Sequence, residues 1–206
     1  MNKKIFTRNI GTEKIYLRTE ENGDRFIDGY AILFNQRSKL IRDWDGEYYE
    51  IIAKGAADRV LQDPDLNVIA TVDHWRDKML GRTKSGTLQL KIDDKGLMYS
   101  VKVPSTTLGN DIAEMIARGD YFESSFIFTV NKMQWDKTQD PNVRTILEIE
   151  KLFDVSIVID GAYANTAVKL RSQEWEQEDD YDVQPKNNRS DILLLKRQLE
   201  IHKLKL

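Results

Sequence analysis

Two adjacent serines, Ser124 and Ser125, begin the run Ser-Ser-Phe-Ile-Phe-Thr-Val. Its β-branched and aromatic residues predict a strand that starts at or just before Ser124. A serine hydroxyl becomes a useful nucleophile only when a base takes its proton. The chain has two histidines, His74 and His202, and only His74 lies in the part expected to be globular. If the chain does serine chemistry, the base is therefore His74.

An acidic residue near the histidine would complete such a site. Asp73-His74, Glu123-Ser124-Ser125 and Asp154-Val-Ser each border an apolar run. Strand ends of a barrel gather at one rim, where a serine, a histidine and a carboxylate could form a nucleophile, a base and an orienting group. On the residues alone, a Ser-Ser pair at a strand edge more commonly caps a turn or fills a solvated position.

The strand expected over 155–159 separates two candidate acids, Asp154 and Asp160. At about 3.3 Å per residue, six residues place their backbones on the order of 20 Å apart. Only one of them can reach His74 if His74 and Ser125 share a rim. Asp160 stands beside Gly161 and is typical of a turn.

The length, charge and composition of the chain argue against several classes of protein. A chain of 206 residues can form one well-buried domain with an appendage, and its net charge of -3 argues against a dedicated nucleic-acid binder. No apolar run reaches membrane-spanning length, and the N-terminus has no signal-peptide core, so we expect a cytoplasmic protein. The absence of cysteine excludes disulfides and thiol nucleophiles. A single core histidine argues against a catalytic zinc, and we expect no metal and no cofactor.

The elements that must position these residues are mostly strands. Alternation and β-branched runs predict strands over 14–18, 25–34, 48–53, 67–72, 87–92, 97–103, 124–130, 144–152 and 154–159. Short helices are expected over 55–62 and 107–118, the second capped by Thr107 or Asn110 and ended by Gly119. This order predicts a mainly β (α+β) fold, as a closed or partly closed, mostly antiparallel β-barrel.

The composition changes after Arg171. We expect a barrel domain over 1–171 and an acidic polar linker over 172–190. An amphipathic helix is expected over 191–206, with apolar residues at a 3-4-3-4 spacing. His202 falls on that seam and is more simply a packing residue than a catalyst.

Several short blocks of the sequence resemble, in order, those of a known protein family. In chain order they are Asp-Gly-Tyr-Ala-Ile-Leu-Phe-Asn, Tyr-Glu-Ile-Ile-Ala-Lys-Gly-Ala, Asp-His, Leu-Gly-Arg-Thr-Lys-Ser-Gly-Thr-Leu, Gly-Leu, Arg-Gly-Asp, Ser-Ser-Phe-Ile-Phe and Asp-Val-Ser-Ile-Val. This series, over about 29–171, resembles the prohead (capsid maturation) serine proteases of tailed bacteriophages with the HK97 type of capsid assembly.

The resemblance implies a β-barrel core related to the herpesvirus assemblins and a serine endopeptidase. It implies cleavage of the scaffold, or of the scaffolding arm of the major capsid protein, and of the protease itself. This would take place inside the assembling procapsid in the host cytoplasm, by a homo-oligomer such as a dimer, without nucleic acid or membrane. Matched by position, the family's nucleophile is Ser125, its histidine is His74 and its acid is Asp154.

Two departures from the family pattern stand near the site. The chain has Asp-Gly-Ala at 160–162 where the family has Pro-Ala, and Trp75 follows the histidine where an acidic or polar residue is common. An oxyanion hole is also needed, formed by backbone N–H groups or by an arginine. Arg82 and Arg171 are candidates for it, although each could instead form a surface ion pair.

Two other functions remain open on the sequence. One is a non-catalytic assembly or scaffold-binding module that uses the same barrel, with the C-terminal helix as its contact. The other is a carbohydrate or nucleic-acid binding barrel, which the lack of a basic stripe and of clustered aromatics disfavours.

Overall fold

The structure is a computed structural model, and it describes residues 5–10, 15–43 and 45–159. The expected linker and C-terminal helix lie outside the described residues, as do Asp160, Arg171 and His202. No helix in these described ranges is long and apolar enough to cross a membrane.

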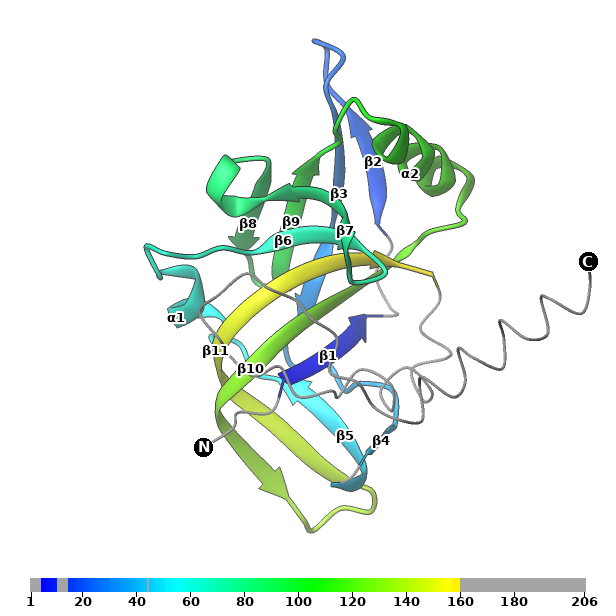
Figure 1. Cartoon of the computed structure of the whole chain (residues 1–206). Coiled ribbons are helices and arrows are strands. Elements are labelled where there is room, and N and C mark those ends of the chain that lie inside the picture. Colours follow the sequence, from blue (N-terminus) through cyan, green and yellow to red (C-terminus); the bar gives the residue numbers. More distant parts are fainter. Residues whose placement is uncertain (1–4, 11–14, 44, 160–206) are drawn as a thin grey trace, which may run out of the picture. The chain divides into compact units, whose positions relative to one another are not determined.

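The described strands form two sheets (Figure 1). The larger, seven-stranded sheet contains β1 (Ile5–Ile10), β10 (Glu123–Asp136), β11 (Asn142–Val158), β5 (Gly46–Ile52) and β4 (Ile41–Asp43) in that order, and β6 (Ile69–Val72) and β7 (Trp75–Arg82) join it through β11. The smaller sheet has the order β2 (Tyr16–Thr19), β3 (Arg25–Leu33), β9 (Gly96–Lys102) and β8 (Leu88–Ile92).

The mainly β fold with short helices is confirmed, but the expected barrel closure was wrong. Within the ranges that the structure describes, the strands form two separate sheets and no closed barrel. A barrel closes only when its outermost strands pair with each other. In the larger sheet β11 pairs in parallel with both β5 and β6, through different halves of its length, so the sheet branches along β11 instead of closing.

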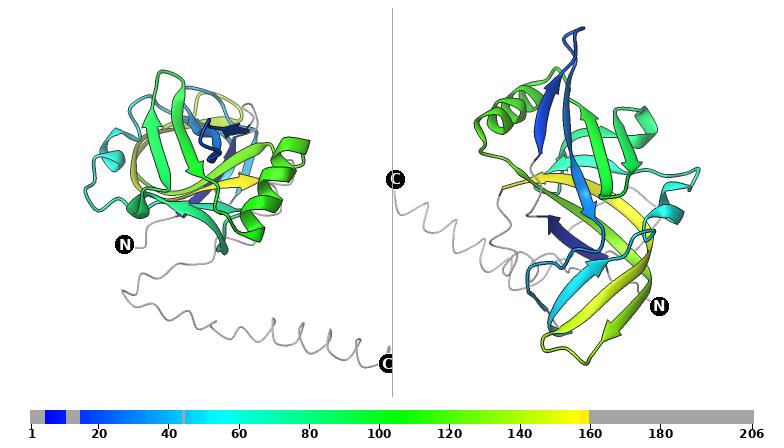
Figure 2. Two further views of the ribbon diagram at one scale, coloured as in Figure 1. Left: turned by 90° about the horizontal axis from the view of Figure 1, so that it is seen from above. Right: turned by 180° about the vertical axis from the view of Figure 1, so that it is seen from behind.

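The two long strands β10 and β11 run side by side through the larger sheet (Figures 1 and 2). The sequence predicted two strands over 144–152 and 154–159, but the structure has the single 17-residue strand β11. The register between β10 and β11 shifts at four places. Such bulges bend and twist a sheet and change which residues face the core. One of them falls at Phe153, where the sequence suggested a break.

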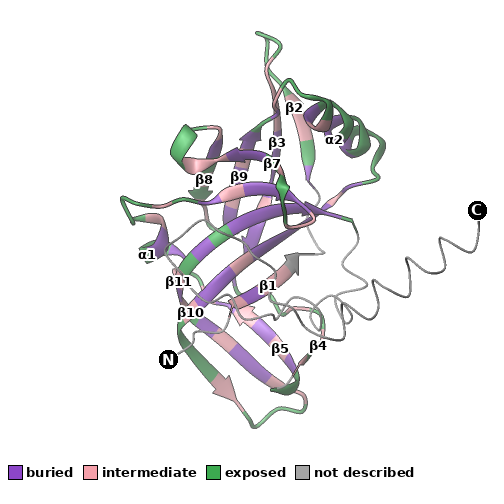
Figure 3. Ribbon diagram, in the orientation of Figure 1, coloured by how far each residue is buried: buried purple, intermediate pink, exposed green. Residues whose placement is uncertain are grey.

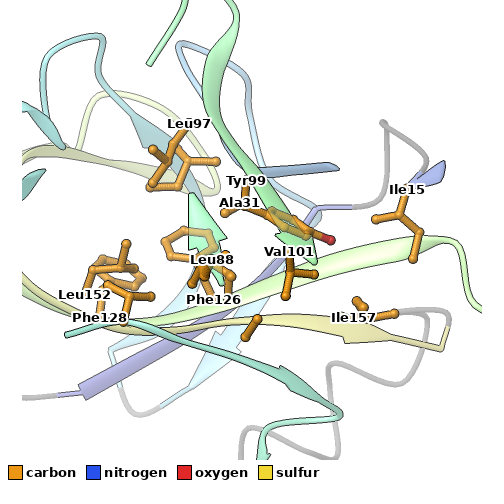
Figure 4. Close-up of a cluster of buried hydrophobic side chains, with 14 of the residues drawn as sticks. Ile15, Ala31, Leu88, Leu97, Tyr99, Val101, Phe126, Phe128, Leu152 and Ile157 are labelled. Atoms are coloured by element: carbon orange, nitrogen blue, oxygen red, sulfur yellow. The ribbon is translucent and has the colours of Figure 1, made fainter. Parts of the chain in front are cut away.

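The core lies between the two sheets, whose facing strands are buried (Figures 3 and 4). Phe126, Phe128 and Ile157 come from the larger sheet and face Tyr99 and Val101 of the smaller one. All five are nearly inaccessible to water. Burial of such apolar area is the main favourable contribution to folding, so this packing fixes β10 and β11 in place.

Local chemistry explains the elements that the sequence predicted best. α2 (Thr107–Arg118) has the expected bounds, and Gly119 ends it in the left-handed conformation at φ 84°. Its N-cap is Thr106, not Thr107 or Asn110, because the Thr106 hydroxyl accepts the Gly109 N–H. The β8–β9 hairpin is also as predicted.

β4, β7 and the part of β10 beyond Val130 lie outside the strand ranges that the sequence predicted. α1 (Asp58–Leu61) is a single turn, shorter than the helix expected over 55–62. A 3₁₀ turn over Thr83–Ser85 follows β7.

Candidate active site

His74 lies in a two-residue turn between β6 and β7. Asp73 and His74 both have positive φ, at 51° and 61°, and Val72 pairs with Trp75 across the turn. Two left-handed residues make the hairpin turn that suits the strand twist, but Asn and Gly normally occupy it. For non-glycine residues this conformation carries strain, which surrounding contacts must hold.

Three hydrogen bonds hold this turn against the neighbouring strands. The Asp73 N–H donates to the Ile157 carbonyl at 3.0 Å, and the His74 N–H donates to Ser156 Oγ at 2.9 Å. The Tyr121 hydroxyl, just before β10, donates to Asp73 Oδ2 at 2.9 Å. Burial and then this hydrogen bond raise the pKa of Tyr121 to about 12, so the phenol keeps the proton that it donates. The turn is thereby fixed to both β10 and β11.

Ser125 and Ser124 face opposite sides of β10. Ser125 lies opposite Ser156 of β11, whereas Ser124 shares the core face with Phe126. The Ser124 hydroxyl is 2.9 Å from the Tyr99 hydroxyl of the smaller sheet, and both side chains are buried. Burial raises the pKa of Tyr99 above its ordinary value. Ser124 is therefore used in the contact between the sheets.

Asp154 shares a face with Ser125 because the register between the two strands is regular here. Ser125 pairs with Ser156 and Ile127 pairs with Asp154, so these residues alternate with the core residues Phe126 and Val155. The next pair is Phe128 with Leu152, so Phe153 is an extra residue. This bulge shifts the alternation before Asp154, which lets Leu152 enter the core as Val155 does.

The three residues predicted as nucleophile, base and acid form a continuous chain of contacts. His74 Nε2 lies 2.6 Å from Ser125 Oγ. His74 Nδ1 lies 2.9 Å from Asp154 Oδ2 and 3.0 Å from Oδ1. The side chains of His74 and Asp154 are each 5% exposed, and Ser125 is fully buried. All three therefore meet in a region from which water is almost excluded.

This geometry assigns the proton positions. An ionised carboxylate only accepts hydrogen bonds, so Nδ1 carries the ring proton toward Asp154. Nε2 then presents a lone pair to the Ser125 hydroxyl. The arrangement can take a proton from Ser125 and stabilise the resulting imidazolium beside Asp154.

Ser125, His74 and Asp154 do not lie together at a barrel rim, contrary to the sequence prediction. Ser125 and Asp154 lie inside β10 and β11, and only His74 lies in a turn. Arg82, one oxyanion candidate, stands at the other end of β7 from His74 and donates to Asn67 Oδ1. The Arg82 guanidinium is thus engaged with Asn67. Trp75 begins β7 and is half exposed.

Sequence reasoning missed two hydroxyls that contact the predicted residues. Thr71 of β6 and Ser156 of β11 are buried beside Asp154 and His74. Ser156 stands two residues after Asp154, a spacing that places both on one face of a strand and could have indicated it. The residues that the structure describes hold no cluster of His, Cys, Asp or Glu able to bind a metal.

A protein-family model and a solved structure match this chain. The family model described as caudovirus prohead serine protease matches residues 13–180. The chain belongs to this family. It is therefore a prohead serine protease by family, as its sequence blocks suggested.

A solved structure agrees with the fold. The capsid assembly protease of bacteriophage T4 matches with a TM-score of 0.52 and 11% identity, over 78% of this chain and 99% of that one. At this identity the likeness concerns the fold alone. No curated protein sequence matches the chain closely enough to count as a relative.

Proposed function

We propose that this prohead protease works with a Ser-His-Asp triad in which Ser125 is the nucleophile, His74 the base and Asp154 the orienting acid. The observation that carries the proposal is the unbroken contact from Ser125 Oγ through the His74 ring to the Asp154 carboxylate. General base catalysis requires the base within hydrogen-bond reach of the proton that it removes, and 2.6 Å meets this requirement.

The steps follow from the proton positions. Ser125 Oγ attacks the peptide carbonyl carbon while its proton passes to His74 Nε2, and Asp154 stabilises the imidazolium. His74 then gives this proton to the leaving amine, the C–N bond breaks, and an acyl ester remains on Ser125. Water attacks the ester, its proton passes to His74, and the carboxylate product leaves as Ser125 regains a proton. The sum is hydrolysis of one peptide bond.

The substrates that suit this family are proteins of the assembling capsid. We propose cleavage of the scaffold or of the scaffolding arm of the major capsid protein, and of the protease itself, inside the procapsid in the host cytoplasm. A homo-oligomer such as a dimer is part of the same proposal. Because Ser125 is fully buried, a polypeptide can reach it only when the surrounding chain moves.

Co-expression with the phage's own scaffold and major capsid protein tests this function. Wild-type protein should shorten at least one of them or itself, as seen on gels and by mass spectrometry of the new termini. Ser125→Ala should leave all of them intact while the procapsid still assembles. Equal shortening by Ser125→Ala would overturn the triad. Normal assembly with no cleavage by the wild-type protein would favour a non-catalytic assembly module.

A further inference from the structure

Two buried hydroxyls that belong to no part of the triad lie in a row with Ser125. Ser156 of β11 is the register partner of Ser125 in β10 on one side and of Thr71 in β6 on the other. Partners in register point to the same face of a sheet. Ser125, Ser156 and Thr71 therefore cross three strands on one face, and Asp154 shares this face because it stands two residues before Ser156.

The hydrogen bonds of these two hydroxyls connect the backbone of His74 with its own side chain, through Asp154. Thr71 Oγ1 donates to Asp154 Oδ2 at 2.9 Å, and Thr71 Oγ1 and Ser156 Oγ are 3.1 Å apart. Ser156 Oγ accepts the backbone N–H of His74 at 2.9 Å. With the contact between Nδ1 and Asp154, these groups close a ring from the His74 backbone to the His74 imidazole.

The protons available on each hydroxyl determine which group donates in each of these hydrogen bonds. Each hydroxyl has one proton, and Thr71 gives its proton to the acceptor-only carboxylate. Ser156 then has its own proton for the Thr71 hydroxyl, for the Thr71 carbonyl oxygen at 3.2 Å or for the Ile157 carbonyl oxygen at 3.5 Å. Every donor in the ring finds an acceptor, and Asp154, 4% exposed, gains a second donor beside the imidazole. A buried carboxylate without hydrogen-bond donors is costly to the fold, so both donors support the position of Asp154.

We propose that Thr71 and Ser156 are positioning residues for the triad. Thr71 fixes the Asp154 carboxylate in plane with the imidazole, and Ser156 holds the His74 backbone in its left-handed turn. Neither residue touches the reacting atoms, and both act through His74 and Asp154. This role rests on the function proposed above.

The test compares Thr71→Val, which removes the hydroxyl, with Thr71→Ser, which keeps it. The probe is a fluorophosphonate, whose phosphorus bonds to Ser125 Oγ as fluoride leaves and His74 takes the proton. Thr71→Val should lower the limiting labelling rate by about ten- to a hundredfold, the effect of one hydrogen bond to a charged group. The half-saturating probe concentration should stay unchanged. Thr71→Ser should restore most of the rate, and the buried control Thr129→Val should stay within about twofold of wild type.

Coupling to Asp154 separates positioning from general structural support. In an Asp154→Asn background, Thr71→Val should cost almost nothing more, because the group through which it acts is already lost. A structural role would give the same loss in both backgrounds. Thermal midpoints of all variants, measured alongside, show whether each one is folded. If Thr71→Val does not fold, the comparison of Thr71→Ser with Ser156→Ala decides, and Ser156→Ala should show the same coupling to Asp154→Asn.

A spectroscopic readout does not depend on labelling. The chain has two histidines, so His202→Ala leaves His74 alone in a ¹⁵N-histidine spectrum. The Nδ1 proton should lie at low field in that protein and move upfield with Thr71→Val but not with Thr71→Ser. An unmoved resonance with an unchanged labelling rate would overturn the role of Thr71. Wild-type protein that does not label at Ser125 would instead overturn the proposed function itself.

Discussion

His74 is held by contacts to its backbone, to its turn and to its ring. Its backbone is fixed by Ser156, its turn by Ile157 and Tyr121, and its ring by Asp154 and Ser125. Two successive non-glycine residues with positive φ persist only where the surroundings determine them. The strain in the turn is thus balanced by contacts that also aim the imidazole.

Removal of the imidazole should abolish proteolysis. His74→Ala leaves Ser125 without a base, whereas His202→Ala should cleave like wild type. Because triad members act as a unit, His74→Ala combined with Ser125→Ala should cost little beyond either change alone. The measurement is the cleavage rate of the co-expressed capsid protein, and additive losses in the double variant would assign His74 another part.

Neutralising the acid should slow turnover without unfolding the protein. Asp154→Asn keeps the shape of the side chain but removes the charge that holds Nδ1–H and stabilises the imidazolium. Turnover should fall on the order of a thousandfold or more. Cleavage rate and thermal midpoint are compared with those of Asp160→Asn. If Asp160→Asn is the slower variant, Asp154 is not the acid.

The sequence predicted the candidate histidine and serine of the site, but not all of the groups that surround them. A single core histidine was enough to select His74, whereas the resemblance to the family was needed to select Ser125 over Ser124 and Asp154 over Asp160. Thr71 could not be selected, because buried hydroxyls in strands are common and only the register places it beside Asp154, whereas Ser156 could be placed on the face of Asp154 but not beside His74. Spacing along one strand shows a shared face, but it does not show which strand lies next to it.

At the scale of elements, a buried ionic cluster joins β1, β5 and β11. Glu50 of β5 pairs with Arg8 of β1 and with Arg144 of β11, and the Arg144 Nε–Glu50 Oε2 distance is 2.8 Å. Arg144 is fully buried and its guanidinium lies against the rings of Phe6 and Tyr48. Burial alone would raise the pKa of Glu50, but the charges of Arg8 and Arg144 outweigh burial and lower it.

Glu50→Gln should therefore destabilise the fold strongly. It leaves buried positive charge without its partner, which costs about 3–5 kcal/mol. Glu47→Gln in the same strand is the matched control, because Glu47 and its partner Arg42 are both more than half exposed. The control should change the free energy of unfolding by less than about 1 kcal/mol. Equal effects in denaturant titrations would contradict a stabilising role for the cluster.

The cluster also predicts an acid dependence of stability. The pKa of Glu50 is lower in the folded chain than in the unfolded one, so the unfolded state binds the proton more readily at acidic pH. Its contribution is complete above the unfolded value of about 4.3 and is lost as pH falls through the folded value. The free energy of unfolding should drop more steeply below about pH 4 in wild type than in Glu50→Gln. Parallel pH profiles would show that other carboxylates cause acid unfolding.

Elements were predictable where local signals agree with the final contacts. α2 has an apolar stripe, a threonine cap and a terminal glycine, and its bounds came out as expected. The sequence of β7, Trp-Arg-Asp-Lys-Met-Leu-Gly-Arg, has no alternation and becomes a strand only through its pairing with β6. β11 looked like two strands because the bulge at Phe153 shifts its alternation, and only the register with β10 shows that the strand continues.

At the scale of the whole molecule, the described residues account for both sheets and for the triad. A chain truncated after Arg171 should therefore fold with the thermal midpoint of the full chain to within a few degrees, since roughly 1 kcal/mol shifts it by about 2–4 °C at this size. It should be poorly incorporated into procapsids, because we expect the segment beyond 171 to serve in targeting. Circular dichroism and procapsid composition measure the two effects. A truncated chain that cannot fold would place the expected C-terminal helix in the core.

The proposed nucleophile that His74 activates is Ser125 and not its neighbour Ser124. Labelling with a fluorophosphonate followed by digestion with trypsin tests it directly, because both serines fall in the peptide 119–132 and fragment ions distinguish them. The adduct should lie on Ser125, persist in Ser124→Ala and vanish in Ser125→Ala and in His74→Ala. An adduct on Ser124, or undiminished labelling without His74, would contradict the triad.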